Sequence, residues 1–247
     1  MRLFADYHTH TRHSHGYGTV AENVRAAVAR GLSEVAITDH GPRLRFGLGV
    51  RNADELLRIR DEVDAINAMN PGITVLVGVE ANVISCDGEL DVPTQILDQL
   101  DIVLCGLHPQ AITKTWRDAM RLTWQNTAVA RLSDRLYRRA REDNTNALVA
   151  AIYRNDIDII THPGLWLPID TAALARACAE RGTCLEISAG HPYMTVEFVK
   201  VAAREGADFA IGSDAHRPER VGELGRGIAV AEAAGLPPSR IINARHD

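Results

Sequence analysis

The chain has 247 residues, of which 46% are hydrophobic and 24% are charged, and its formal net charge is −5. This composition excludes a disordered chain and allows a substantial buried core. The lysines and arginines form no run that would provide the basic surface of a nucleic-acid-binding protein, so a nucleic-acid partner is not expected. No apolar run reaches the roughly 18 residues of a membrane span.

The four cysteines, at positions 86, 105, 178 and 184, form no C-x-x-C pair. In a chain of this size they are expected to be reduced and mostly buried. The N-terminal segment MRLFADYHTH contains no signal-peptide core. These features predict a cytoplasmic protein, and they leave open whether it forms a homo-oligomer.

Short apolar runs rich in Val and Ile alternate with longer amphipathic stretches along the chain. This alternation is typical of repeated βα units that build a parallel sheet. Seven strand-like runs, each followed by a helix or a long loop, predict a closed or nearly closed α/β barrel, with a doubly wound open sheet as the alternative. The runs cover residues 2–7, 34–38, 73–79, 101–107, 157–161, 183–188 and 207–212.

The amphipathic stretches predict the helices. The first covers about residues 20–30 and opens with a capping box, Thr19-x-x-Glu22. The second opens at Asn52-x-x-Glu55 and runs to about residue 70, where a Pro-Gly pair ends it. Since no linker-like segment interrupts this pattern, we expect one domain over residues 1–247. Further helices are predicted over residues 117–141, from about residue 145, and over 170–181, 195–205 and 219–234.

Histidines and acidic residues gather where the predicted strands end. The carboxyl ends of parallel barrel strands all point to one face, and that face carries the active site. Imidazoles that converge there need a partner, which a divalent ion such as Zn, Mn or Fe provides. The candidate metal ligands are His8, His10, His15, His40, Glu80, His108, His162, Asp214 and His216.

Two local spacings strengthen this interpretation. In His8-x-His10 and Asp214-x-His216 the two ligands are one residue apart, so the period-two alternation of a strand places both on the same side. Nine potential ligands exceed the usual four of a single zinc ion, so two or three ions are expected to share a bridging carboxylate. Glu80 is the predicted bridge, because it stands alone at the end of its strand.

These segments together resemble the PHP (polymerase and histidinol phosphatase) family, and most closely its small bacterial phosphatase branch. The resemblance spans the chain and is carried by DYHTH (6–10), SH (14–15), TDHGP (38–42), GVEAN (78–82), GLH (106–108), THPG (161–164) and GSDAH (212–216). It implies a distorted (β/α)7 TIM-like barrel with three divalent metal ions, Zn, Mn or Fe, at the carboxyl ends of the strands.

The resemblance also implies how the ligands are divided among the ions. One ion would be bound by His8, His10, Glu80 and Asp214. A second would be bound by His15, His40 and His216. A third would be bound by His108 and His162, with Glu80 bridging the first and third ions.

One segment departs from the small phosphatase branch. The stretch between the fourth and fifth strands is longer than expected there, and the extra material is an Arg-rich helical insertion around residues 112–141 that contains Trp116 and Trp124. It is interpreted as a lid, a substrate-contacting element, an oligomer contact or an ordinary exposed helix.

The implied function is hydrolysis of small phosphomonoesters. The hypothesis is that a hydroxide bridging two ions attacks phosphorus, because bound metals lower the pKa of water towards about 7. His13 is the candidate acid for the leaving group, and His191 is expected to line the pocket. Asp6 and Asp39 precede ligands and are expected to orient imidazoles, with Asp6 the better candidate because it faces the same side as His8 and His10. Ser14 and Ser213 are expected to hydrogen-bond near the ligands. Arginines after the ligand-bearing strands are the candidate phosphate contacts, namely Arg12, Arg43, Arg45 and Arg217.

Four alternatives remain open. The first is a phosphatase specific for histidinol phosphate, and the second is a DNA-repair-type nuclease. The third is a metal-dependent amidohydrolase-like enzyme, which is disfavoured because Lys114 and Lys200 are poorly placed for a modified-lysine bridge. The fourth is a metal-stabilised binding domain without activity.

Overall fold

The computed structural model describes residues 1–69, 71–126 and 133–245. Its strands form one parallel sheet in which every strand pairs with the next strand along the chain. Two of the strands have only two residues, which makes the barrel irregular. In chain order the strands are β1 (Ala5–Asp6), β2 (Glu34–Ile37), β3 (Thr74–Asn82), β4 (Ile102–Gly106), β5 (Ile159–Ile160), β6 (Cys184–Ser188) and β7 (Phe209–Gly212).

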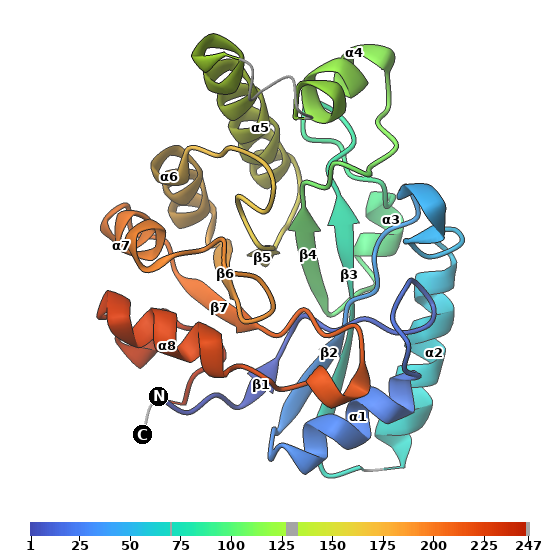
Figure 1. Cartoon of the computed structure of the whole chain (residues 1–247). Helices are drawn as coiled ribbons and strands as arrows, with labels where there is room; N and C mark the ends of the chain where they lie inside the picture. The colour runs from blue at the N-terminus through green and yellow to red at the C-terminus, as the bar shows by residue number, and fades with distance from the viewer. Residues whose placement is uncertain (70, 127–132, 246–247) are drawn as a thin grey trace.

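The helices surround the strands (Figure 1). Short 3₁₀ segments at 45–47, 124–126, 218–220 and 238–240 and a π-helical turn at 119–123 complete the elements. None of the described helices is long and apolar enough to cross a membrane. The α-helices are α1 (Val20–Ala29), α2 (Glu55–Ala68), α3 (Thr94–Leu97), α4 (Trp116–Asp118), α5 (Asp134–Arg154), α6 (Thr171–Arg181), α7 (Val196–Arg204) and α8 (Gly225–Ala234).

The first and last strands meet at their carboxyl ends. Thr9 and Ala215 form a parallel bridge just beyond β1 and β7. The His10 amide donates to the Ala215 carbonyl at 2.8 Å, and the Ala215 amide donates to the His8 carbonyl at 3.2 Å. The predicted α/β TIM-like barrel is therefore confirmed. The doubly wound alternative is wrong, because the strand order never reverses.

Apolar side chains pack in two layers on the two faces of the sheet. The larger layer lies between the strands and the helices and includes Val77, Ile187 and Phe209. The smaller layer fills the inside of the barrel below the carboxyl ends of the strands. It consists of Ala5, Tyr7, Ala36, Ile102, Leu104, Ile159, Cys184 and Ala210.

The inward-facing positions change from apolar to polar along a strand. On β4, Ile102 and Leu104 belong to the inner apolar layer, and His108 follows on the same period-two series. On β7, Ala210 belongs to that layer and Asp214 follows in the same way. The barrel therefore has an apolar floor and a polar mouth, and the strand alternation sets which side chains reach the mouth.

The predicted starts of the first two helices have different outcomes. The predicted capping box at Thr19 and Glu22 is present, so the start of α1 is confirmed. The predicted opening of the second helix at Asn52 is wrong. Helix α2 begins at Glu55 after Asp54, and no side-chain hydrogen bond caps it.

The helical insertion differs from the prediction of one helix over 117–141 and a second one from about residue 145. Helix α4, the π-helical turn and a 3₁₀ turn occupy 116–126, and residues 127–132 of the predicted insertion lie outside the described residues. Ser133 then caps α5 by accepting from the Leu136 amide. Helix α5 continues through Thr145, whose hydroxyl donates to the Arg141 carbonyl one turn earlier, so no new helix starts there.

Gly212 makes room for the buried side chains beneath the barrel mouth. A Cβ at this position would lie 2.2 Å from Glu186 Oε1 and 2.9 Å from His8 Cβ. We expect Gly212→Ala to lower the free energy of unfolding by about 1–3 kcal/mol, because the closely packed neighbours must shift. Urea denaturation of the metal-free protein measures this change without a contribution from metal binding.

Gly225→Ala is the matched control, because a Cβ at Gly225 in α8 would meet no atom within 4 Å. This variant should be unchanged or more stable by up to about 1 kcal/mol, since Ala favours a helix over Gly. Equal stability of the Gly212→Ala protein and the wild type would contradict the steric argument.

Candidate metal centre

Six of the seven strands bring the nine predicted ligands to one mouth of the barrel, and only β6 carries none of them. His8, His10 and Glu80 each offer a ligand atom within 4.8 Å of one another, and His8 does so again with His162 and Asp214. Two further groups of this kind consist of His10, His40 and His216, and of His40, Glu80 and His108.

Glu80 lies at the centre of this cluster and is fully buried. Its Oε1 is 2.9 Å from Nε2 of His162 and 3.3 Å from Nε2 of His108. Its Oε2 is 2.8 Å from Nδ1 of His40 and 3.2 Å from Nε2 of His8. Each oxygen therefore faces a different set of imidazoles, which is the arrangement that a carboxylate bridging two ions requires.

Asp214 is the second carboxylate of the cluster. Its Oδ1 lies 3.2 Å from Nε2 of His10 and 3.5 Å from the nearest ring nitrogens of His8 and His216. Its Oδ2 lies 2.9 Å from Nε2 of His191. One oxygen thus faces the predicted ligands, and the other contacts a histidine that the sequence pattern placed only in the pocket lining.

His15 approaches the cluster through its ring neighbours. Its ring centroid is 4.2 Å from that of His216 and 5.0 Å from that of His40. His10 stacks on both His40 and His216 at 4.4 Å. These four imidazoles therefore lie against one another, and the neutral ring is the form of an imidazole that binds a metal.

Several buried donor and acceptor atoms in the cluster have no hydrogen-bond partner among the described residues. His40 Nδ1 and Glu80 Oε2 are only 2.8 Å apart, yet neither atom makes a hydrogen bond. Leaving buried polar atoms unpaired costs about 1–3 kcal/mol each. Cations between them would satisfy Glu80 Oε2 and one ring nitrogen of each of these histidines, so the residues fit a metal centre. The unpaired atoms are His8 Nε2, both ring nitrogens of His10, His40 Nδ1, Glu80 Oε2 and His108 Nε2.

The electrostatics of the cluster differ from ring to ring. They favour neutral imidazoles at His10, His15 and His40 and ionised carboxylates at Glu80 and Asp214. At His8 and His162, nearby carboxylates outweigh burial and raise the pKa. Burial lowers the pKa of His40 to about 4 and, helped by His40, lowers that of His10 well below its usual value. Burial would raise the pKa of Glu80, but the imidazoles of His40, His8 and His108 outweigh burial and lower the pKa well below its usual value. Imidazole nitrogens with free lone pairs and carboxylates are the donors that Zn, Mn and Fe accept.

Hydrogen bonds to Nδ1 turn Nε2 of several imidazoles towards the centre. Glu186 on β6 accepts from Nδ1 of His8 at 2.7 Å, and Asn82 Oδ1 accepts from Nδ1 of His108 at 2.7 Å. Asp91 fixes the Asn82 amide by accepting from its Nδ2 at 2.6 Å. Such partners set the tautomer and the direction of a metal-binding histidine.

These orienting residues were missed in the sequence. The signal for Glu186 was a single acid within the apolar run CLEIS, and Asn82 stood two residues after Glu80 on the same face of β3. Asp91 lies in a loop, so only the folded chain shows that it reaches Asn82.

The acids next to the ligands have backbone roles. Asp39 accepts from the Thr11 amide at 2.8 Å and from the Ser14 hydroxyl at 2.5 Å, which fixes the loop that carries His15. Asp6 contacts no imidazole and does not orient one as expected. It accepts from backbone amides, including those of Ser213 at 3.1 Å and Gly222 at 2.9 Å.

Two predicted ligands have backbone angles that side chains rarely adopt. His162 has φ +26° and Asp214 has φ +51°, in the region that favours glycine. Strained residues of this kind persist where the surrounding structure holds them for a function. Both lie two residues beyond the end of a strand, and their side chains belong to the cluster at the mouth of the barrel.

A cavity of about 120 Å³ lies over the cluster. Its described lining contains no lysine or arginine, and its apolar part comes from leucines after β2 and from a leucine and a tryptophan after β5. The lining residues are His15, His40, Leu44, Leu48, His108, Gln110, His162, Leu165, Trp166, His191, Asp214 and His216.

The other predicted site residues lie outside this cavity. His13 contacts two carboxylates of α2, with Nδ1 3.0 Å from Glu55 and Nε2 3.1 Å from Glu62. Of the predicted phosphate contacts, Arg12, Arg43 and Arg45 do not line the cavity, and Arg43 donates to the Thr113 carbonyl at 3.2 Å.

Arg217 also lies outside the cavity, because its guanidinium stacks over the Tyr17 ring at 4.3 Å. The predicted ligands are therefore brought together, whereas the predicted acid and arginines are not.

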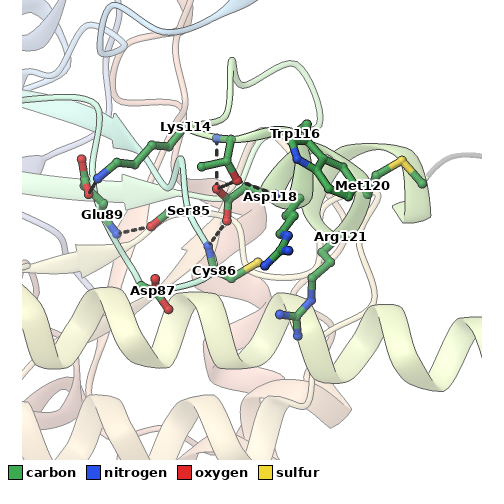
Figure 2. A pocket seen from close by; sticks show the side chains of 11 residues that line it. Ser85, Cys86, Asp87, Glu89, Lys114, Trp116, Asp118, Met120 and Arg121 are labelled. Atoms are coloured by element: carbon green, nitrogen blue, oxygen red, sulfur yellow. Dashed lines mark hydrogen bonds and ion pairs between the residues drawn. The ribbon is translucent and has the colours of Figure 1, made fainter.

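A larger cavity of about 470 Å³ lies between the 85–89 turn and the insertion. Figure 2 shows its lining, with Lys114 beside Glu89 and with Asp118 hydrogen-bonded to the Cys86 amide. Arg121, also in its lining, forms an ion pair with Asp143. A third cation of the lining, Arg117, lies over the Trp116 ring at 5.7 Å. Because no histidine is among the described lining residues, this cavity offers no second place for the same metal-dependent chemistry.

Glu186 is expected to control metal affinity through two hydrogen bonds. Its Oε1 accepts from His8, and its Oε2 accepts from the His162 amide at 2.7 Å. The side-chain amide of Glu186→Gln has only one acceptor oxygen, so either His8 or the His162 amide loses its hydrogen-bond acceptor. We expect zinc affinity to fall about 10–100-fold, as a chelator-competition titration would measure. Glu197→Gln, on an exposed position of α7, is the control, and an unchanged affinity of the Glu186 variant would refute this role.

Comparison with known proteins agrees with this site. A family model described as "PHP domain" matches residues 6–164. A "probable phosphatase" from Caldanaerobacter subterraneus subsp. tengcongensis is 32% identical over 257 residues, which covers 100% of this chain and 89% of that protein. A "probable phosphatase" from Edwardsiella ictaluri is 32% identical over 249 residues, covering 97% of this chain and 89% of that protein.

Among solved structures, the histidinol phosphate phosphatase of Lactococcus lactis subsp. lactis, in complex with zinc, L-histidinol and phosphate, has the same fold. It matches with a TM-score of 0.64 and 15% sequence identity, over 95% of each chain. Because the family model spans more than half of the chain and the relatives align along nearly all of it, this chain belongs to the PHP domain family.

Proposed function

We propose that this metal-dependent phosphoesterase hydrolyses small phosphomonoesters at a centre of three divalent ions. The reaction consumes one water, breaks the P–O bond to the leaving group, and yields an alcohol and inorganic phosphate. The proposed ligands are His8, His10, His15, His40, Glu80, His108, His162, Asp214 and His216.

The observation that carries the proposal is the set of buried, unpaired ligand atoms around Glu80. An ordinary polar core would pair these atoms with one another. The two oxygens of Glu80 face separate sets of imidazoles, which supports a bridging role between an ion near His8 and an ion near His162. The group of His10, His40 and His216 supports a further ion on the other side of the cluster.

Divalent ions bound here would lower the pKa of water towards neutrality and neutralise the oxygens of a phosphate group. The chain's own residues hold the donors in place. Glu186 directs His8, the Asn82–Asp91 pair directs His108, and the Leu48 carbonyl accepts from Nδ1 of His15 at 3.0 Å.

His13 plays no part in the proposed reaction, because both of its ring nitrogens contact acids of α2 outside the cavity.

The size and lining of the cavity support a small substrate. A space of about 120 Å³ with no lysine or arginine in its described lining suits one phosphate group rather than a nucleic-acid backbone. The net charge of −5 also disfavours a nuclease.

An amidohydrolase-like centre with a modified-lysine bridge is disfavoured, since Lys114 pairs with Glu89 and Lys200 lies near Glu197 on α7.

Metal removal and reloading test the proposal. Chelated protein should lose hydrolysis of a phosphomonoester panel, and reloading with Zn, Mn or Fe should restore it. Elemental analysis should give up to three ions per chain. Glu80→Gln should hold fewer ions and lose more than about 100-fold in activity, because even the loss of a residue that only orients a ligand costs about 10–100-fold.

The control for this experiment is Glu197→Gln, which changes an exposed carboxylate of α7. It should keep the wild-type metal content and activity. Full activity of the chelated protein, or of the Glu80→Gln protein, would show that hydrolysis does not depend on this centre.

A further inference from the structure

We propose that Trp166 forms a stacking platform at the mouth of the cavity and selects phosphomonoesters whose leaving group carries an uncharged planar ring. This inference rests on the proposed function, since it names the substrate class of the same site. It is carried by the small size of the cavity, the placement and backbone of Trp166, and the charge of the rim.

The cavity is too small to enclose a whole substrate. Its volume is about 120 Å³, whereas pockets that bury most of a drug-sized molecule measure about 300–1,000 Å³. A phosphate group over the cluster therefore leaves the organic part of the ester at the rim. Residues of the rim, rather than those of the floor, must then distinguish one leaving group from another.

Trp166 is the largest apolar side chain of that rim. It lines the cavity, yet 51% of its surface is exposed. Its neighbours Leu165 and Leu167 are buried, which anchors the loop on both sides of the tryptophan. The Trp166 ring lies 6.3 Å from that of His191, and His191 is held by Asp214 at 2.9 Å. The indole is thus fixed beside the cluster with much of its surface open.

The backbone at Trp166 adopts a disfavoured conformation although the side chain is half exposed. Its φ is +60°, in the left-handed region, where residues other than glycine are disfavoured. Because half of the tryptophan surface is exposed, burial of the side chain contributes little stability to offset the cost of this backbone conformation. Strain that persists without a packing benefit points to a function, which here is the presentation of the ring to the cavity.

The rim offers stacking and neutral hydrogen bonding but no free charge. Leu44, Leu48 and Leu165 complete the apolar wall, and the Gln110 side chain has no hydrogen-bond partner among the described residues. Both oxygens of Asp214 already face imidazoles, so no free carboxylate is left for an ammonium group. A planar, uncharged leaving group therefore fits this rim better than an amino alcohol or a second acid.

Binding of two phosphonates to the metal-loaded protein tests the inference without relying on turnover. The probes are 3-phenylpropylphosphonate and butylphosphonate, which differ by the ring. Isothermal titration should give a roughly tenfold lower Kd for the ring-bearing probe, as expected for one aromatic pair. Trp166→Ala should reduce this ratio to about one, and Trp166→Phe should keep most of it.

Two further variants separate stacking from structural damage. Trp166→Gly should lose the Kd ratio while its Tm is equal to or higher than that of wild type, because glycine relieves the strained backbone. Trp116→Ala removes a tryptophan that is 73% exposed and lines the other cavity, so it should keep the wild-type ratio. A purely structural Trp166 would instead lower the Tm when replaced and leave the ratio unchanged.

Hydrolysis assays distinguish failure of this inference from failure of the proposed function. Wild type should prefer 2-phenylethyl phosphate to propyl phosphate and to 2-aminoethyl phosphate. If all three esters are hydrolysed at equal rates and the two phosphonates have equal Kd values, the inference about Trp166 is wrong and the proposed phosphatase activity is still supported. If none of the esters is hydrolysed but the Kd ratio still depends on Trp166, only the proposed phosphatase activity is wrong. No binding of either phosphonate would overturn both.

Discussion

The structure depends on one buried carboxylate surrounded by histidines. Glu80 has no exposed surface, and its two oxygens lie within 3.3 Å of ring nitrogens of His162, His108, His40 and His8. An isolated carboxylate buried in this way would be strongly disfavoured, and partial pairing with imidazoles leaves several atoms unsatisfied. Cations shared between these groups resolve the conflict, so metal binding and the stability of the barrel mouth are linked.

The rest of the barrel supports this arrangement by shape and by hydrogen bonding. The inner apolar layer fills the lower half, so the inward positions above it must hold the polar groups. Gly106 and Gly212 leave space where a Cβ would meet ligands, at 2.4 Å from His108 Cε1 in the first case. Glu186 and Asn82 then fix two of the rings, so ligand directions are set by residues of the strands themselves.

The sequence predicted the strands and the ligands because both depend on local patterns. Each ligand follows an apolar run, and a strand end fixes where it points. The residues that orient the ligands could not be predicted in the same way, since the contact of Glu186 with His8 joins positions 178 residues apart. His13 and Arg217 followed the same strand ends as the ligands, but their loops turn them towards Glu55 and Tyr17. The position of a residue after a strand does not show which way the following loop directs its side chain.

The junction of the first and last strands has a consequence for biosynthesis. His8 and His10 come from the start of the chain, Asp214 and His216 come from near its end, and the Thr9–Ala215 bridge joins the two segments. A nascent polypeptide that has not reached the seventh strand therefore lacks Asp214 and His216, two of the nine proposed ligands. The complete set of ligands can assemble only after that strand has been synthesised.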